Sequence, residues 1–260
     1  MYADNETDYI EACRQEINAY PNHIKNDGNS LCRKVLNALR NEELLTARNG
    51  HDQLPPDFYS TTYGIMFDAL RVNDTETNSE RGKLINNKFA LERKMEKELK
   101  HLGMDIDDCT IFYNSEYVDF KEHSLLNFSN QAKRTIDEHI SKIHIWDKEL
   151  PDIKYKGLFI FDESGVYFEG ECIPVERPAE NSQWLFKFKD NPPHIYFPWL
   201  DKTIMQSICD SSIFFVVWFC PYKHSAIVEQ TGVNYPSVTI LDVRYGKTLV
   251  EYTYDEYTLG

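Results

Sequence analysis

Short runs of consecutive apolar residues alternate with helix-like patterns in the second half of the chain, and this alternation restricts the fold more than any other feature. Buried strands are predicted at 109–113 (CTIFY) and 157–162 (GLFIFD). Between them, apolar residues at helical spacing predict a helix over 129–143. A strand, a helix and a strand in this order form a βαβ unit, which favours parallel pairing of the two strands.

The remaining elements make the predicted sheet mixed. A hairpin is expected in which 166–173 is the return strand after 157–162 and the turn at 163–165 (ESG), and a helix is expected over 201–210. The other predicted strands are 61–72, 166–173, 184–189, 213–220, 238–243 and 249–254. The sequence therefore predicts an α/β fold, with a mixed central sheet flanked by helices and a mainly helical N-terminal part.

A polar stretch divides the chain into two predicted parts. Residues 73–87 are rich in turn-forming side chains, which is typical of a loop or a domain boundary. We therefore predict a helical N-terminal extension or subdomain over 1–80 and an α/β core domain over 86–260. The helices expected in the first part are 4–19 and 30–47.

The chain is acidic. Its 260 residues include 28 Lys and Arg against 42 Asp and Glu, which gives a formal net charge of −14. This charge repels phosphate backbones at long range, so a nucleic-acid role would need a local basic patch or bound cations. We expect nucleic acid as a partner only with metal assistance, and a basic protein as the alternative partner.

No membrane or secretion signal is recognised in the sequence. The longest apolar run, 213–220, is a third to a half of the roughly 20 residues that span a bilayer. The N-terminal residues lack the basic and apolar regions of a signal peptide. The six cysteines are scattered without zinc-binding spacing. We predict a cytoplasmic protein without membrane contact or a disulfide framework.

Acidic residues follow two of the predicted buried strands. Asp162 ends the strand 157–162, and Glu116 and Asp119 follow the strand 109–113. If these strands are parallel neighbours, their carboxylates meet at one edge of the sheet. Carboxylates are the ligands that Mg²⁺ prefers, so Asp162, Glu116 and Asp119 are predicted to bind Mg²⁺ as a cofactor. Further acids that could join them are Glu163, Asp68 and Asp242.

From residue 129 onward, the order of helix, three strands, helix and strand resembles the core of the restriction-endonuclease-like nucleases. Those nucleases carry a carboxylate on one strand and a D/E-x-K triplet on the next. Here the third strand, 184–189, reads WLFKFK, with no acid two residues before either lysine. The resemblance implies Lys187 or Lys189 as the catalytic residue that polarises a water. It also implies metal ligands on the preceding strand: Glu169 and Glu171.

The segment 27–33 (DGNSLCR) resembles the D-G-N-C-L-x-R signature of the OTU cysteine proteases. In that family a loop delivers the nucleophilic cysteine to a helix N-terminus, where the helix dipole helps to ionise the thiol. Here Ser30 stands at the nucleophile position and Cys32 follows two residues later. The resemblance implies an OTU-like protease relic. The alternative is a turn followed by a helix that Asn29 or Ser30 caps.

Motifs for several enzyme classes are missing from the sequence, among them the P-loop, G-x-G-x-x-G, H-E-x-x-H and G-x-S-x-G. We predict a divalent-metal-dependent hydrolase, either a phosphodiesterase or a nuclease. The alternative is a non-catalytic binding module whose acidic surface contacts a basic protein and whose aromatic side chains are anchors. The aromatic residues considered as anchors are Tyr196, Phe197, Trp199, Trp184 and Trp218.

Overall fold

A seven-stranded mixed sheet lies at the centre of the protein in the computed structural model, which confirms the predicted α/β fold class. The described residues are 6–48, 55–74, 76–78, 84–86, 125–174, 184–188, 194–221, 223–224, 227, 232–245, 248–252 and 256–259. The strands of the central sheet, in spatial order, are β1 (Ile24–Asn26), β11 (Val238–Asp242), β10 (Phe215–Phe219), β7 (Tyr155–Asp162), β4 (Ile65–Val72), β3 (Phe58–Ser60) and β2 (Thr46–Ala47).

Three neighbouring strands, β4, β7 and β10, run parallel and end at the same edge of the sheet, which we call the carboxyl edge. Val72 of β4 aligns with Asp162 of β7, and Phe161 aligns with Phe219 of β10. The helix α4 (Leu125–Ser141) lies between β4 and β7 in the chain, and α6 (Lys202–Cys209) precedes β10. β11 is antiparallel to β10, so it begins at the carboxyl edge and ends at the opposite edge.

The predicted βαβ unit is present, but its first strand is β4. β7 is hydrogen-bonded to β4 on one side and to β10 on the other, so it has no free side for a strand at 109–113. The expected pairing is therefore wrong, and residues 109–113 themselves lie outside the described residues. Apolar runs reveal which segments are strands, whereas the neighbour of each strand depends on contacts between distant parts of the chain.

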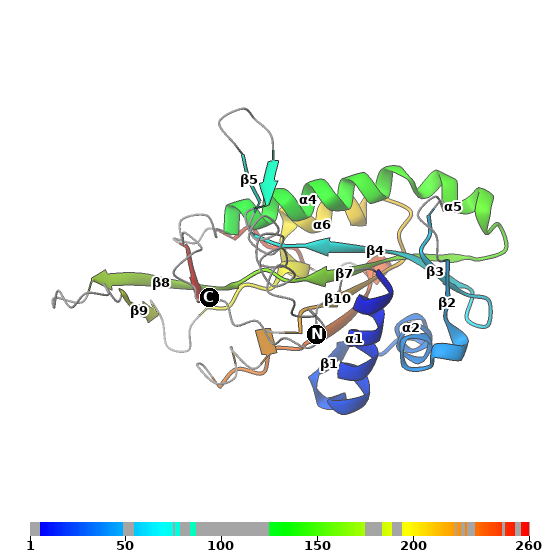
Figure 1. Ribbon diagram of the computed structural model, residues 1–260, viewed down its shortest axis with the longest axis horizontal. Helices are drawn as coiled ribbons and strands as arrows, with labels where there is room; N and C mark the ends of the chain where they lie inside the picture. Colours follow the sequence, from blue (N-terminus) through cyan, green and yellow to red (C-terminus); the bar gives the residue numbers. More distant parts are fainter. Residues whose placement is uncertain are drawn as a thin grey trace, which may run out of the picture.

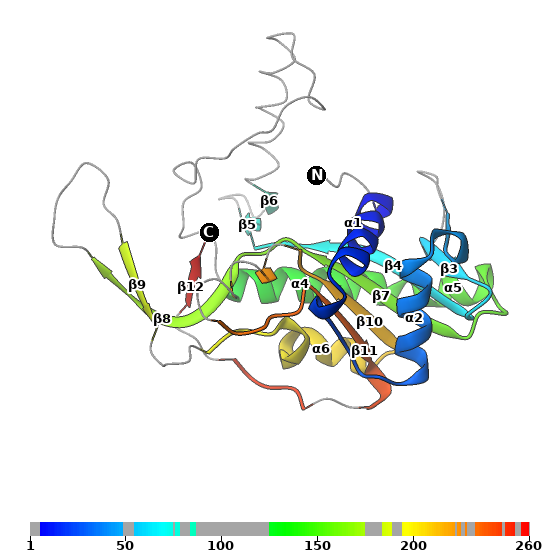
Figure 2. The same ribbon diagram turned by 90° about the horizontal axis from the view of Figure 1, so that it is seen from below.

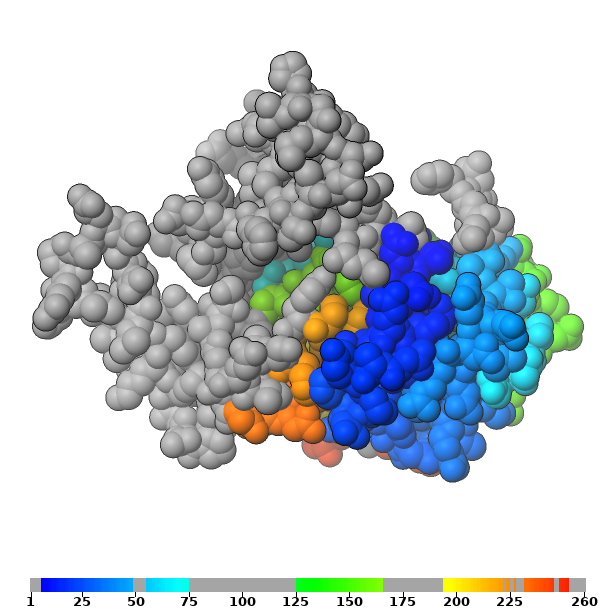
Figure 3. All heavy atoms as spheres, turned by 60° about the horizontal axis from the view of Figure 1, so that its bottom comes forward, coloured from blue at the N-terminus to red at the C-terminus, as the bar shows by residue number. Residues whose placement is uncertain are grey.

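Helices cover both faces of the central sheet (Figure 1). One face carries α4, α5 (Ile143–Glu149) and α6, and the other carries α1 (Glu6–Ala19) and α2 (Ser30–Arg40). Figure 3 shows α1 and α2, in blue, packed together over their face. Short 3₁₀ helices connect several elements: η1 (Pro21–His23), η2 (Glu42–Leu44), η6 (Pro198–Leu200) and η7 (Val243–Tyr245). None of the described helices is long and apolar enough to cross a membrane.

Alternate residues of β7 serve two separate hydrophobic cores. Leu158 and Ile160 belong to the core under α4 and α6, whereas Phe159 and Phe161 belong to the core under α1 and α2. This alternation follows from the pleat of a strand, which points successive side chains to opposite faces. Because both faces are covered by helices, the strand reads as a continuous apolar run in the sequence.

The N-terminal part of the chain contributes strands as well as helices. β1 to β4 all precede residue 80, and they lie in the same sheet as β7, β10 and β11. The sheet therefore crosses the boundary that was predicted between 80 and 86. The helix predicted over 30–47 ends at Arg40, because the backbone of Asn41 is extended and its side chain accepts a hydrogen bond from Glu43 N.

Two smaller sheets lie outside the central sheet. β8 (Val166–Pro174) pairs with β9 (Trp184–Phe188) and with β12 (Glu256–Leu259), and β5 (Glu76–Asn78) pairs with β6 (Leu84–Asn86). The hairpin predicted from 157–162 and 166–173 is wrong, because β7 lies between β4 and β10 and β8 pairs with β9 and β12 instead. Figure 2 shows the hairpin of β8 and β9 extending away from the body of the molecule. In the strand predicted over 249–254, Val250 makes a single bridge with Asp201, and residues 253–255 lie outside the described residues.

Candidate functional site

Asp162 lies at the carboxyl edge, at the buried end of β7. Its Oδ1 accepts hydrogen bonds from the backbone N and the Oγ of Ser164, at 2.9 and 2.6 Å. Its Oδ2 accepts hydrogen bonds from Trp218 Nε1 and Lys223 Nζ, each at 2.8 Å. Four protein donors therefore occupy the two oxygens of this carboxylate.

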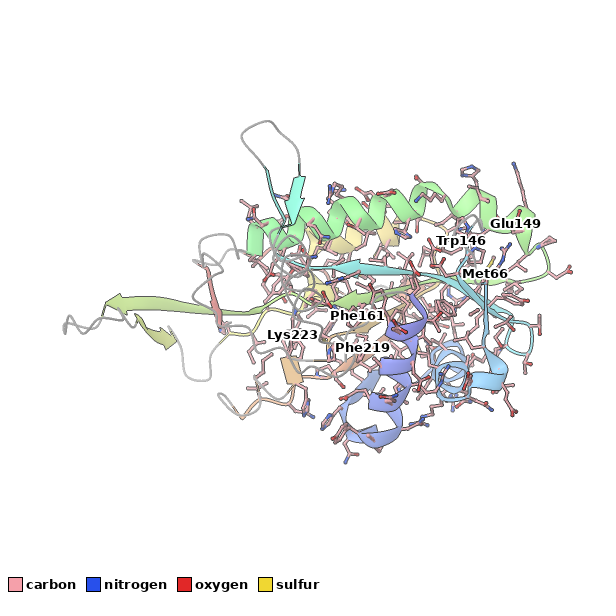
Figure 4. The ribbon with its side chains drawn as sticks, viewed as in Figure 1. Met66, Trp146, Glu149, Phe161, Phe219 and Lys223 are labelled. Carbon is pink, nitrogen blue, oxygen red and sulfur yellow. The ribbon has the colours of Figure 1, made fainter. Side chains whose placement is uncertain are left out.

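Lys223 is buried together with Asp162. The side chain of Lys223 is 4% exposed and that of Asp162 is 0% exposed. The ammonium group also donates to Ser164 Oγ at 2.8 Å and lies 5.4 Å from the centre of the Phe128 ring. Figure 4 places Lys223 near Phe161 and Phe219, where β7 and β10 end. The ion pair therefore joins the loop after β10 to the loop after β7.

The predicted Mg²⁺ site falls largely outside the described residues. Glu116, Asp119 and Lys189 are not among them, and Lys187 is placed only through its backbone, which aligns with Glu171 of β8. In the part of the chain that the structure describes, no group of three or more His, Cys, Asp or Glu side chains could hold a metal ion. The Mg²⁺ site therefore stays a prediction.

The other acids that could have joined Asp162 are kept apart from it or paired. Glu163 accepts a hydrogen bond from Arg71 Nε at 2.6 Å. Asp242 lies at the opposite edge of the sheet, because β11 is antiparallel to β10, and it pairs with Arg244. Asp68 lies four residues before the end of β4, about 13 Å along the strand. The expectation that Asp68 and Asp242 could meet Asp162 is therefore wrong.

Asp68 belongs to a second polar cluster, which lies between the sheet and α4. Its buried side chain is on the same face of β4 as Met66 and Leu70, and its Oδ2 is 2.5 Å from His139 Nδ1 of α4. Asp57 immediately precedes β3, accepts a hydrogen bond from Ala69 N at 2.8 Å, and hydrogen-bonds to Asp68 through its carboxyl group. We call Asp57, Asp68 and His139 the acid–histidine cluster.

The cluster holds its protons in a defined order. Burial raises the pKa of Asp57 to about 8, and the negative charge of Asp68 contributes to the same shift. At neutral pH Asp57 therefore keeps a proton, which lies in the hydrogen bond between the two carboxyl groups. A carboxylate can only accept hydrogen bonds, so His139 Nδ1 donates to Asp68. In the neutral imidazole, Nε2 is then the acceptor nitrogen, on a ring that is partly exposed.

Asp68 was predicted to join a different site, and neither Asp57 nor His139 was predicted as a site residue. One signal was present in the sequence. Asp68 interrupts the apolar face of a strand, and a buried carboxylate needs a hydrogen-bonding partner. His139 shares a helix face with Ala132 and Ile136, which is the apolar face of the predicted helix. Asp68 and His139 are therefore both polar residues on otherwise apolar faces, which makes each a candidate partner for the other. The position of Asp57, in contrast, depends on the β3–β4 register.

The raised pKa of Asp57 predicts a pH-dependent stability. In the unfolded chain an aspartate titrates near pH 4, so between about pH 4 and 8 the folded protein binds more protons than the unfolded chain. The free energy of unfolding should therefore fall as the pH rises through this window. Asp57→Asn removes this contribution, so the variant should gain stability relative to the wild type as the pH rises. Urea unfolding across the window measures the difference.

The exposed Asp152 supplies a matched control for that measurement. Asp152→Asn should differ from the wild type by the same amount at every pH. The groups that also act on Asp57, namely Asp68, the backbone N of Ala69 and Glu6, are present in wild type and variant alike, so the difference isolates Asp57. A wild-type minus Asp57→Asn difference that stays constant with pH would contradict the shifted pKa.

The segment that resembles the OTU signature forms a capped helix start. Asn29 is the N-cap of α2, and its side chain accepts a hydrogen bond from Cys32 N at 2.9 Å. Cys32 is fully buried, and its Sγ lies 3.7 Å from the carbonyl oxygen of Ile240. These contacts are those expected from the capping alternative. The OTU-like function itself stays a prediction.

Comparison with protein-family models, with curated proteins and with solved structures found no match for the chain. The fold and the described side chains therefore define the class: a mixed-sheet α/β protein with an acid–histidine cluster between the sheet and α4, in which Asp68 is buried and His139 is partly exposed.

Proposed function

We propose that the protein is a hydrolase in which His139 acts as the general base. The observation that carries the proposal is the 2.5 Å contact between Asp68 Oδ2 and His139 Nδ1, with Asp57 behind Asp68. A carboxylate in this position orients the imidazole, fixes its tautomer and stabilises the imidazolium that forms when Nε2 takes a proton. This proposal keeps the hydrolase class that the sequence predicted and assigns it to other residues.

Water is the nucleophile that best fits this arrangement. In the described part of the chain, His139 has a hydrogen bond to Asp68 and none to a serine, threonine or cysteine. In the proposed step Nε2 removes a proton from a water molecule, and the resulting hydroxide attacks the ester carbon or phosphorus of a bound substrate. The imidazolium then returns that proton to the leaving oxygen. Asp68 acts as a positioning residue throughout.

Hydrolysis of two chromogenic probes tests the proposal. The probes are p-nitrophenyl acetate, a carboxylic ester, and bis(p-nitrophenyl) phosphate, a phosphodiester. The wild-type protein should hydrolyse at least one of them faster than buffer does. His139→Gln should lower kcat by about 10²–10⁴-fold, which is the usual contribution of a general base. Asp68→Asn should lower kcat and also change its pH profile, because it disturbs the tautomer of His139.

The matched control is His144→Gln, since His144 is an exposed histidine of the neighbouring helix α5. This variant should keep the wild-type rate. The proposal fails if neither probe reacts faster than in buffer, or if His139→Gln and His144→Gln have equal rates. The probe that reacts also distinguishes the predicted phosphodiesterase from a carboxylesterase.

The metal-dependent form of the predicted hydrolase stays a prediction with its own test. Mg²⁺ that binds only the folded protein raises the melting temperature by an amount set by its concentration relative to Kd. If Glu116 and Asp119 bind Mg²⁺, this rise should disappear in the double variant Glu116→Gln/Asp119→Asn. A melting temperature that does not respond to millimolar Mg²⁺ would remove these two residues and Asp162 as ligands.

Three of the five aromatic residues considered as anchors for a non-catalytic binding module cannot contact a partner. Tyr196, Trp199 and Trp218 are buried in the core under α4 and α6, so they are not available to a partner. The side chain of Trp184 lies outside the described residues. A basic protein partner for the acidic surface stays a prediction, and the hydrolysis assay separates this alternative from the enzyme.

A further inference from the structure

Three positively charged side chains surround one tyrosine at the edge of the sheet opposite the carboxyl edge. Tyr155 is the first residue of β7. The centre of its ring lies 5.4 Å from Lys34 Nζ, 5.1 Å from Lys154 Nζ and 5.8 Å from Arg244 Cζ. These residues come from α2, from the loop before β7 and from η7, so the fold brings together cations from distant parts of the chain.

The two lysines of this group differ from Arg244 in their ion pairing. Arg244 makes hydrogen bonds with both carboxylate oxygens of Asp242, at 2.9 and 2.6 Å. Among the described residues, neither Lys34 nor Lys154 has an ion pair. In a chain with a net charge of −14, two lysines without an ion pair to a described acid, next to an arginine, form a local basic patch.

Aromatic side chains border the same cations. Arg244 Cζ lies 5.1 Å from the centre of the Phe214 ring and 5.9 Å from that of Tyr245. Tyr245 is 72% exposed, which is unusual for so large a ring, and the side chain of Arg244 is 43% exposed. We call Lys34, Lys154, Arg244, Tyr155 and Tyr245 the cation–tyrosine patch. An exposed ring beside basic side chains is the combination that binds a base and its phosphate.

We propose that the cation–tyrosine patch binds a nucleotide, with Lys34 and Lys154 contacting the phosphate and Tyr245 stacking on the base. The three cations repel one another, and a bound phosphate relieves that repulsion. The sequence predicted that nucleic acid would bind only with metal assistance, whereas this patch provides the positive charge from side chains. A mononucleotide and a single strand share this chemistry, and the test below distinguishes them.

The patch is separate from the acid–histidine cluster. Tyr155 and Phe214 pack against the core under α1 and α2, whereas Asp68 is on the face covered by α4. Figure 1 shows α2 and α4 on opposite sides of the strands. Nucleotide binding therefore does not depend on the proposed hydrolase, and either proposal can fail without the other.

The experiment is fluorescence anisotropy of a labelled oligothymidylate at low salt, followed by competition with unlabelled AMP and with inorganic phosphate. The wild-type protein should bind the oligonucleotide, and binding should weaken with salt with a log–log slope of about −0.7 for each phosphate contacted. Lys34→Gln/Lys154→Gln should weaken binding by about 10-fold or more and should flatten this slope. Tyr245→Leu should weaken binding without changing the slope.

The matched control is Lys133→Gln/Lys142→Gln, which removes one lysine of α4 and the lysine that follows this helix, on the other face of the sheet. All of these lysines are at least partly exposed, and melting temperatures should verify that each variant is folded. Competition by AMP at concentrations comparable with the oligonucleotide identifies a mononucleotide site, and competition by the oligonucleotide alone identifies a single-strand site. The proposal is overturned if neither binds, if the control loses as much affinity, or if phosphate competes as well as AMP.

Discussion

Lys223→Met should lower the free energy of unfolding by about 3–5 kcal/mol, because it leaves the carboxylate of Asp162 buried without its cation. The carboxylate would keep its hydrogen bonds from Ser164 and Trp218, but these donors carry no full charge. Moving an unpaired ion out of water is the larger cost. The midpoint of urea unfolding at neutral pH measures the effect.

A double-mutant cycle separates the interaction energy of the ion pair from the effect of replacing the lysine side chain itself. Asp162→Asn should also destabilise the protein, since it leaves the ammonium group of Lys223 buried without its counter-ion. The double variant Asp162→Asn/Lys223→Met should be more stable than the sum of the two single effects implies. Lys202→Met serves as the control, because Lys202 pairs with Glu251 on the exposed surface and should change little. Additive single effects would show that the two groups do not interact.

Gly157→Ala should destabilise the protein by about 3 kcal/mol, the upper end of the cost of an overpacked core. A methyl group at position 157 would overlap the ring of Phe215 on the neighbouring strand. That ring is fully buried and contacts Phe67 edge-on, so it has little room to move. The variant removes no contact and no hydrogen bond, so steric overlap is the only source of the expected loss.

A smaller residue at position 215 should partly restore the stability of that variant. Phe215→Leu alone leaves a cavity and should destabilise the protein. Combined with Gly157→Ala, however, it removes the overlap, so the double variant should lose less stability than the sum of the single losses. Thermal unfolding of the three variants provides the comparison. Losses that simply add would mean that the ring of Phe215 does not limit the residue at 157.

The sequence predicted those parts of the fold whose apolar pattern is complete within one segment. β7 and β10 are covered on both faces and therefore read as continuous apolar runs, and α4 and α6 show helical spacing. The short strands β1, β2 and β3 were not predicted, because two or three residues are too few to show the alternation of apolar and polar residues. The pairing of β4 with β7 escaped because residues 73–124 separate β4 from α4 in the chain.

The surroundings of the candidate residues were less predictable than the elements. Asp162 was correctly placed at the end of a buried strand, but its cation is Lys223, and the two are 61 residues apart. No local spacing encodes such a contact. Asp57 and Asp68 meet only through the β3–β4 register, which the sequence did not reveal. The clustering of Lys34, Lys154 and Arg244 likewise depends on α2 and η7 meeting at one end of β7.

The position of β1 at the border of the central sheet has a consequence for synthesis on the ribosome. Among the described strands, β1 pairs only with β11, and the contact between Ser237 Oγ and the carbonyl oxygen of His23 spans 214 residues. The ribosome adds about 5–20 residues per second, so roughly 10–40 s pass between the synthesis of β1 and that of its partner strand β11. During that interval the apolar sides of α1 and α2 have no completed sheet to cover. These apolar sides therefore stay accessible to solvent until the chain has been synthesised through β11.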